Sequence, residues 1–442
     1  MSSIKQKIAE KLLERRERMA RILKTNGSFK VAEVTVEQIY GGIRGVPIQV
    51  SDISYVDPYE GLRLRGYTVP EVLQLLPKPE GGEMPLLGGL YFLLMTGELP
   101  TQEDAEEVEV EWKSRCVLPP HVYDVLNALP KYTHPMTMFS MAILALQSES
   151  IFARRYYYGI QNKYDYWSLF LQDSLNLTAK LPTIAAMIYN MKYREGAEAR
   201  PDPSLDWAGN FAYMIGNEHQ GYQDLCRLFF ILHSDHEGGN VSAHAAHLVG
   251  SALSDIYLSC SAGMDGLAGP LHGLANQECL RWLLGLRDNF DSLPSKEELE
   301  AYLLEYLKSG KVIPGYGHAV LRRTDPRFIA QAEFAKKHMP DDDLYKLVMM
   351  VYDILPPVLT RQGKVKNPWP NVDAINGTLQ YHYGVREFDF YTVLFGVSRI
   401  LGLSTHVTWS RALTKPIERP KSLTTDMLED MIAKDIHTSG ED

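Results

Sequence analysis

Two histidines and one aspartate stand in three short segments that are rich in glycine and proline. His272 lies in Gly-Pro-Leu-His-Gly, His318 in Pro-Gly-Tyr-Gly-His-Ala-Val, and Asp373 in Asn-Pro-Trp-Pro-Asn-Val-Asp-Ala. A carboxylate can remove a proton alpha to a carbonyl group, and neutral imidazoles can donate hydrogen bonds to the oxyanion that results. The combination therefore indicates carbon-acid chemistry.

The segment from Gly315 to His318 matches only the start of a dinucleotide-binding fingerprint. The third glycine is missing, and neither a parallel-sheet pattern nor a suitably placed acidic residue accompanies it. The glycines predict instead a loop whose backbone can approach a ligand closely. Arg322, Arg323 and Arg327 follow the loop, and their guanidinium groups could hold an anionic small molecule.

Histidines cluster between residues 233 and 247, which raises the alternative of a zinc site. Their spacing contains two HxxH pairs, but there is no HExxH motif and no cysteine partner nearby. His244 and His247 stand where an apolar helix begins, so packing at a helix end explains them and we expect no metal. The Gly238-Gly239-Asn240 turn before Ser242, a possible N-cap, predicts a backbone bend that could offer N–H groups to an anion.

Most of the chain that must position these groups has helical periodicity. Residues 30–70 alternate β-branched and aromatic residues with turn signals, which predicts a few short strands. Proline and glycine, including Pro356-Pro357, mark the loops between helices. Apolar residues at three- and four-residue steps predict helices within the following segments: Pro85–Met95, Met136–Leu146, Leu175–Lys192, Gln223–His233, Ala243–Ala262, Leu271–Leu286, Lys296–Lys308 and Phe390–Leu401.

Composition excludes several classes of function. The chain has 442 residues, of which 45% are hydrophobic, so it can bury a large core and form two or three domains. A formal net charge of −10 argues against a nucleic-acid partner, because phosphate binding needs a concentrated basic face. No uninterrupted apolar stretch reaches the roughly 20 residues of a membrane-spanning helix. The cysteines are widely spaced without a CxxC pair, which favours a reducing compartment.

The N-terminal segment from Ile4 to Arg16 combines apolar residues near helical spacing with many basic residues. Organelle transit peptides share these features but are poor in acidic residues, whereas this segment and its continuation contain Glu10, Glu14 and Glu17. We therefore predict a surface helix of the mature fold and a cytoplasmic protein. A processed form of the chain would instead belong to the mitochondrial matrix.

Six segments in a fixed order resemble the citrate synthase family, specifically the kind found in mitochondria. The resemblance runs from about Ile4 to about Leu428, and its most specific segments are residues 233–244, 266–278, 314–322, 324–327, 395–399 and 418–422. It implies an acyltransferase that condenses acetyl-CoA with oxaloacetate and water to give citrate and free CoA, the first step of the tricarboxylic acid cycle. CoA would be a co-substrate, and no permanently bound cofactor is implied.

The same resemblance implies a mainly α-helical homodimer with a small β element near the N-terminus. A large domain would consist of residues 1–273 and 382–442, and a small domain of residues 274–381 would be inserted in it. The active site would lie in the cleft between the two domains. Closure of the small domain would exclude water and assemble the site.

By this resemblance, Asp373 removes a methyl proton from acetyl-CoA while His272 donates a hydrogen bond to the oxygen of the developing enolate. A helix N-terminus at His272 would help to keep that ring uncharged. His318 would polarise the ketone of oxaloacetate. The implied ligands of the two oxaloacetate carboxylates are His236, Arg327 and Arg399 from one subunit and Arg419 of the partner subunit.

For coenzyme A, the resemblance implies contacts from the loop 312–318 and from basic residues near the phosphates. The implied contacts are Arg44, Val312, Gly315, Gly317, Arg322 and Lys366. One departure is Gln161-Asn162-Lys163, where relatives offer a further arginine from the partner subunit; Lys163 could substitute as a point charge. A second is Ile375-Asn376, where relatives commonly have a histidine and a serine.

Two alternatives remain open on the residues alone. A 2-methylcitrate synthase would use propionyl-CoA with the same catalytic residues, and the Ile375 departure beside the base could alter the acyl-chain preference. A catalytically silent homologue could instead bind a metal or another ligand through the His233–His247 cluster. Retention of all three catalytic candidates argues against the silent homologue.

Overall fold

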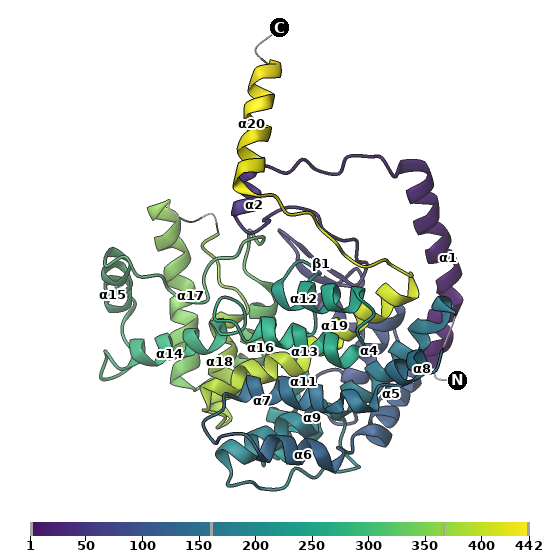
Figure 1. The fold of residues 1–442 in the computed structure, drawn as a ribbon. Coiled ribbons are helices and arrows are strands. Elements are labelled where there is room, and N and C mark those ends of the chain that lie inside the picture. Colours follow the sequence, from purple (N-terminus) through teal and green to yellow (C-terminus); the bar gives the residue numbers. More distant parts are fainter. Residues whose placement is uncertain (1–2, 160–161, 364, 366, 440–442) are drawn as a thin grey trace.

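The computed structural model describes residues 3–159, 162–363, 365 and 367–439, and helices dominate the fold (Figure 1). The described strands form one small antiparallel sheet in the order β1 (Ser54–Asp57), β2 (Gly61–Leu64) and β3 (Tyr67–Thr68). Ser54 pairs with Leu64, and the sheet buries Val56, Leu62 and Leu64. The expected mainly α fold with a small β element near the N-terminus is confirmed.

The α-helices extend over most of the chain. They are α1 (Ser3–Asn26), α2 (Val36–Tyr40), α3 (Val69–Leu75), α4 (Leu87–Thr96), α5 (Gln102–Arg115), α6 (Pro120–Asn127), α7 (Pro135–Ala145), α8 (Ile151–Tyr157), α9 (Tyr166–Tyr193), α10 (Trp207–Met214), α11 (Gln220–Leu232), α12 (Val241–Ser251), α13 (Ile256–Leu267), α14 (Ala275–Arg287), α15 (Lys296–Lys308), α16 (Pro326–His338), α17 (Asp343–Gln362), α18 (Asp373–His382), α19 (Tyr391–Ala412) and α20 (Thr425–Ser439). Short 3₁₀ turns η1 (Leu146–Glu149), η2 (Lys163–Asp165) and η3 (Phe388–Phe390) connect some of them.

The centre of the fold is built on α9 and α19, which are buried along most of their length and pack against each other. A helix that is apolar on nearly every face belongs in the core of a large protein. Two buried aromatic side chains of this core have polar partners: the Tyr91 hydroxyl lies 2.7 Å from the Ser174 hydroxyl, and the Trp409 indole donates to the Met95 carbonyl at 2.8 Å. Helices α14 to α18 pack on one another at one side of this core (Figure 1).

Three sequence-based expectations are wrong in detail. The single helix expected over Ala243–Ala262 is two helices, because the Asp255 carboxylate accepts the N–H groups of the first turn of α13 and starts a new helix. The helix expected from Leu271 begins at Ala275, since Gly269-Pro270 is followed by a turn that contains His272. Pro356 and Pro357 lie within α17 rather than between helices.

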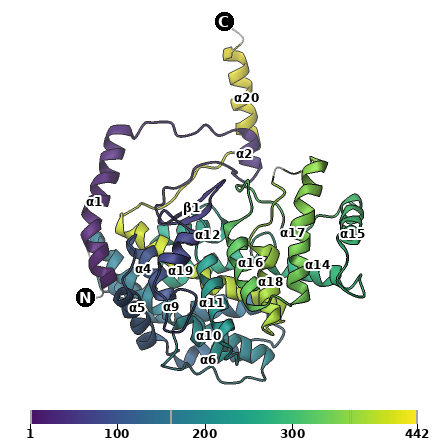
Figure 2. The ribbon, with the colours of Figure 1, turned by 180° about the vertical axis from the view of Figure 1, so that it is seen from behind.

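The two ends of the described chain lie partly away from the body. Helix α1 buries only Ile4, Ile8 and Leu12, which confirms the predicted surface helix. Residues 27–50 then run as an exposed segment containing α2, and α20 projects outward beside α2 (Figures 1 and 2).

Within the described ranges no single helix is long and apolar enough to cross a membrane. The bent pair Pro135–Glu149 and Ile151–Tyr157 is long and apolar enough only when its two parts are taken together, and this holds for length and composition alone.

Candidate active site

The loop before His318 is paired with the segment that leads to Asp373. Residues 315–317 form backbone hydrogen bonds of 2.9 and 3.0 Å with residues 369–371, and an isolated antiparallel bridge lies between them. These two stretches are more than 50 residues apart in the sequence. Their pairing brings two of the residues singled out by the sequence into one site.

Gly315 fits this pairing because its backbone adopts φ +79°. A Cβ atom at this position would lie 2.8 Å from the Cα of Ala374 and 2.9 Å from the sulfur of Cys279. Only glycine tolerates both the left-handed backbone and the close approach. The predicted close approach of this loop is therefore made to its own chain, at the residue that follows Asp373.

The His318 ring is held in one tautomer by its own loop. Its Nδ1 accepts the backbone N–H groups of Val320 and Leu321 at 3.0 and 3.1 Å, so we assign the ring proton to Nε2. Burial, with the positive charge of Arg327, lowers the pKa of His318 to about 4. The ring is therefore a neutral hydrogen-bond donor at neutral pH.

Asp373 is the first residue of α18, and its backbone N–H donates to the side-chain oxygen of Asn371 at 2.9 Å. Burial raises the pKa of its carboxyl to about 6, with Arg327 opposing this shift and Asp325 adding to it. The carboxyl is thus still mainly ionised at neutral pH, while it is a stronger base than an ordinary aspartate. This is the electrostatic state that a general base requires.

The His272 ring faces the N-terminus of α12, a helix that precedes it in the sequence. The Ser242 N–H donates to Nε2 of His272 at 3.4 Å, and the Ser242 hydroxyl lies 3.0 Å from the same nitrogen. We therefore assign the ring proton to Nδ1. Burial, with the charge of Arg399, lowers the pKa of His272 to about 4. The expected helix N-terminus is present, but it belongs to α12, because α14 begins only at Ala275.

Asn240, rather than Ser242, is the N-cap of α12, because its side-chain oxygen accepts the Ala243 N–H at 3.1 Å. Arg399 on α19 is buried against this corner. Its guanidinium donates to the side-chain oxygens of Asn240 and Ser242, both at 3.3 Å, and to the His233 carbonyl at 3.1 Å. The start of α12 therefore contacts both His272 and Arg399.

Arg327, near the start of α16, is buried and forms a salt bridge with Asp325, with Nη2 and Oδ2 2.7 Å apart. His236 lies nearby, with its ring centroid 5.6 Å from that of His318. Burial, with the charges of Arg327 and Arg399, holds the pKa of His236 well below its ordinary value. The two guanidinium groups of Arg327 and Arg399 thus lie close to neutral imidazoles, and this arrangement suits the binding of a small dianion.

The structure therefore brings six of the sequence-predicted residues into one linked cluster: His236, His272, His318, Arg327, Asp373 and Arg399. Sequence reasoning missed several groups that hold them. Asp325 could have been found, because an aspartate before a proline is an N-cap signal. The roles of Asn240 and Ser242 depend on residues that are distant in the sequence, so no local signal showed them.

Comparison with known proteins decides the family. The family model described as "Citrate synthase, C-terminal domain" matches residues 42–421. A probable mitochondrial citrate synthase of Glossina morsitans morsitans is 52% identical over 98% of this chain and 93% of its own. A mitochondrial citrate synthase of Xiphias gladius is 51% identical over 98% of this chain and 92% of its own. The chain belongs to the citrate synthase family.

Solved structures of citrate synthases share this fold. The Pyrobaculum aerophilum enzyme has a TM-score of 0.76 at 28% identity, covering 87% of this chain and 92% of its own. The Thermotoga maritima enzyme has a TM-score of 0.69 at 25% identity, covering 88% of this chain and 96% of its own. The Thermoplasma acidophilum enzyme, solved with carboxymethyl coenzyme A and oxaloacetate, resembles the fold at 21% identity and a TM-score of 0.72, covering 89% and 97%.

The residues expected to contact coenzyme A are more dispersed. Val312 and Arg322 are exposed at the two ends of the His318 loop, and Arg322 donates to the carbonyls of Val320 and Leu321 at 2.7 and 2.9 Å. Arg44 is exposed on the segment 27–50. Lys163 is exposed at η2, whereas Lys366 and Gln161 lie outside the described residues.

Arg419 is exposed on the segment that follows α19. Its neighbour Glu418 anchors this segment on α12: the Glu418 carboxylate lies 2.8 Å from Nε2 of His247 and 3.7 Å from Nε2 of His244. Both histidines lie within α12, which begins at Val241 rather than at His244, and they contact a protein carboxylate. Among the described residues, no group of three or more His, Cys, Asp or Glu side chains could hold a metal ion, so the alternative of a zinc site gains no support.

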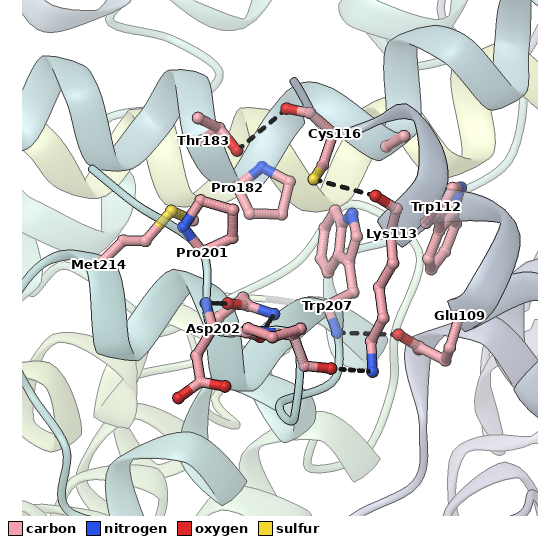
Figure 3. A pocket seen from close by; sticks show the side chains of 13 residues that line it. Glu109, Trp112, Lys113, Cys116, Pro182, Thr183, Pro201, Asp202, Trp207 and Met214 are labelled. Carbon is pink, nitrogen blue, oxygen red and sulfur yellow. Dashed lines mark hydrogen bonds between the residues drawn. The ribbon is translucent and has the colours of Figure 1, made fainter. Parts of the chain in front are cut away.

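A separate cavity of about 230 Å³ lies between α5, α9 and α10 (Figure 3). Trp112, Pro182, Trp207 and Met214 form much of its wall. Its buried carboxyl, Glu109, accepts the N–H groups of Gly88 and Trp207, both at 2.8 Å. None of the residues of the His272, His318 and Asp373 cluster lines this cavity.

Proposed function

We propose that the protein is a citrate synthase that condenses acetyl-CoA with oxaloacetate through an enolate. The observation that carries this proposal is electrostatic: a carboxyl with a raised pKa, Asp373, shares one cluster with two neutral imidazoles whose tautomers are set by backbone N–H groups. Carbon-acid chemistry needs this combination of one base and preorganised neutral donors.

In the first step, the Asp373 carboxylate takes a proton from the methyl group of acetyl-CoA. The electron pair left behind moves onto the thioester oxygen, which accepts a hydrogen bond from Nδ1–H of His272. Because the Ser242 N–H occupies Nε2, the donor nitrogen of His272 does not depend on the substrate. One preorganised donor of this kind contributes on the order of 10²–10³ in rate.

In the second step, the enolate carbon attacks the ketone carbon of oxaloacetate. The ketone oxygen becomes an alkoxide and is stabilised by Nε2–H of His318, the nitrogen left free by the contacts of Nδ1 with Val320 and Leu321. The alkoxide then takes up a proton, which gives a thioester of citrate. Attack of water on the thioester carbonyl then expels the CoA thiolate, which leaves as the free thiol with citrate, and Asp373 gives up the methyl proton so that the base is regenerated.

Oxaloacetate would be held by His236, Arg327, Arg399 and Arg419 of the partner subunit. His236 and Arg399 belong to the proposed large domain, residues 1–273 and 382–442, whereas His318 and Arg327 belong to the proposed small domain, residues 274–381. A dianion bound by both sets can draw the domains together and exclude water from the reaction. We place coenzyme A against the loop 312–318, with Arg44, Arg322 and Lys366 of the same subunit and Lys163 of the partner subunit near its phosphates.

A homodimer completes this proposal. Large apolar side chains are exposed on the segment 27–50, where Phe29, Val31 and Val50 are 73%, 73% and 78% accessible, and on α20 at Met427 and Met431. Apolar side chains gathered on projecting segments favour burial against another protein surface. A second copy of the chain would cover them and bring its exposed Arg419 to the site.

Acetyl-CoA is preferred to propionyl-CoA in this proposal, because the relatives that match over nearly the whole chain are named citrate synthases. The same relatives are named mitochondrial, so the cytoplasmic expectation gains no support, and we place the protein in the mitochondrial matrix at the first step of the tricarboxylic acid cycle. A thiol-release assay at saturating oxaloacetate tests the substrate. Faster turnover with propionyl-CoA than with acetyl-CoA would refute the assignment in favour of a 2-methylcitrate synthase.

A further inference from the structure

Helix α18, which begins with the proposed base Asp373, is joined to α11 and the loop after it by hydrogen bonds between buried side chains. The Asn376 amide lies 3.1 Å from Nε2 of His233, and the Tyr222 hydroxyl donates to the Gln380 amide oxygen at 3.1 Å. Asp373, Asn376 and Gln380 are spaced at i, i+3 and i+7, so they share one face of the helix.

The bond between Asn376 and His233 has a defined direction. Nδ1 of His233 lies 2.9 Å from the Phe229 carbonyl, which can only accept, so Nδ1 carries the proton and Nε2 accepts from the Asn376 amide. Burial, with the charges of Arg327 and Arg399, lowers the pKa of His233 to about 3, so the ring stays neutral. Both side chains are 1% exposed, which leaves neither group a solvent partner.

His233 also contacts the proposed oxaloacetate site. Its backbone carbonyl accepts from the guanidinium of Arg399 at 3.1 Å, and it begins the loop that carries His236. Its ring stacks on Phe229, with centroids 4.3 Å apart and planes at 21°. A ring that is stacked on one face and hydrogen-bonded at both nitrogens is a rigid reference point for α18.

We infer that Asn376 is a positioning residue, which sets the place of the Asp373 carboxylate relative to Arg399 and His236 through its hydrogen bond to His233. This inference rests on the proposed function. The Asn376 amide spans the distance between the helix and the ring and donates to Nε2.

The test compares the variants Asn376→Ala, Asn376→Ser and Gln380→Ala with the full-length wild-type protein. Asn376→Ala removes the donor, and we expect kcat to fall roughly 10- to 100-fold, because a displacement of about 1 Å can cost that much, while oxaloacetate binding stays close to wild type. Asn376→Ser keeps a donor on a shorter side chain and should recover part of kcat. Gln380→Ala is the matched control: it removes the other hydrogen bond of the same helix face and should lower the melting temperature without a comparable loss of kcat.

Asn376→Asp gives a readout that a merely structural role would not change. In this variant a carboxylate faces the lone pair of Nε2 of His233, and the two groups can form a hydrogen bond only when one of them is protonated. The dependence of kcat on pH should therefore gain an ionisation that wild type lacks. The other charged groups acting on His233 are Arg327, Arg399 and Asp325, and all are unchanged in this variant.

The inference would be overturned if Asn376→Ala kept the kcat of wild type, or if Asn376→Ala and Gln380→Ala lost kcat equally. Either result would leave the proposed function intact. If Asn376→Ala does not fold, a pH profile of Asn376→Asp identical to wild type overturns it instead. An inactive wild-type protein would refute the proposed function itself, and the inference with it.

Discussion

The backbone N–H of Ser242 lies 3.4 Å from Nε2 of His272, although the two residues are 30 positions apart in the sequence. This contact ties the tautomer of the proposed enolate donor to the N-terminus of α12. The positive end of a helix disfavours a charged imidazole, and burial acts in the same direction on the pKa of His272. The donor is therefore neutral before any substrate binds.

Proline at position 242 tests this contact directly. Ser242→Pro removes the N–H at the second residue of α12, where the first turn of a helix tolerates proline. We expect a loss of roughly 10²–10³ in kcat, the contribution of one preorganised donor. Ser242→Ala keeps the N–H and is the control; steady-state kinetics of the folded protein should show a much smaller loss. Equal activity of the two variants would mean that the backbone contact does not matter.

The pH dependence of turnover should follow the Asp373 carboxyl. Its pKa is raised to about 6, and the base works only when it is deprotonated, so kcat/KM should rise with pH through about 6 and level off above it. His272 and His318, with pKa values lowered to about 4, stay neutral across this range. A profile that is flat between pH 5 and pH 8 would be inconsistent with Asp373 as the base.

A site shared between subunits predicts complementation. Arg419→Ala and Asp373→Asn should each be nearly inactive alone. In a hybrid dimer, the subunit with intact Asp373 receives Arg419 from its partner, so one composite site is complete. Mixing the two variants under conditions of verified subunit exchange should therefore restore part of the thiol-release activity. Failure to recover any activity would argue for a site built within one subunit.

The order of binding follows from where the charges lie. His236 and Arg399 face His318 and Arg327 across the proposed domain boundary, so oxaloacetate can bring the two sides together before coenzyme A binds. Calorimetry with a non-reactive analogue of acetyl-CoA should then give a higher affinity in the presence of oxaloacetate, and by linkage the reverse must hold equally. The same affinity in both titrations would contradict closure driven by oxaloacetate.

The sequence predicted the chemistry better than the way it is held in place. His272, His318 and Asp373 could be found because glycine and proline mark the loops that present them, and most helices follow from their apolar periodicity. The break between α12 and α13 was also readable, since Asp255 is an N-cap residue. The contacts of Ser242 with His272 and of Asn376 with His233 join residues 30 and 143 positions apart, so local patterns carry no information about them.

The most direct test of the account is the fate of labelled acetyl-CoA. Wild-type protein, given acetyl-CoA labelled in its methyl carbon and saturating oxaloacetate, should form labelled citrate in equal amount to the free thiol released. Asp373→Asn should bind oxaloacetate as tightly as wild type but form citrate roughly 10²–10⁴ times more slowly, the usual contribution of a general base. Citrate formation by Asp373→Asn at a rate near that of wild type, or thiol release without labelled citrate in wild type, would contradict the mechanism.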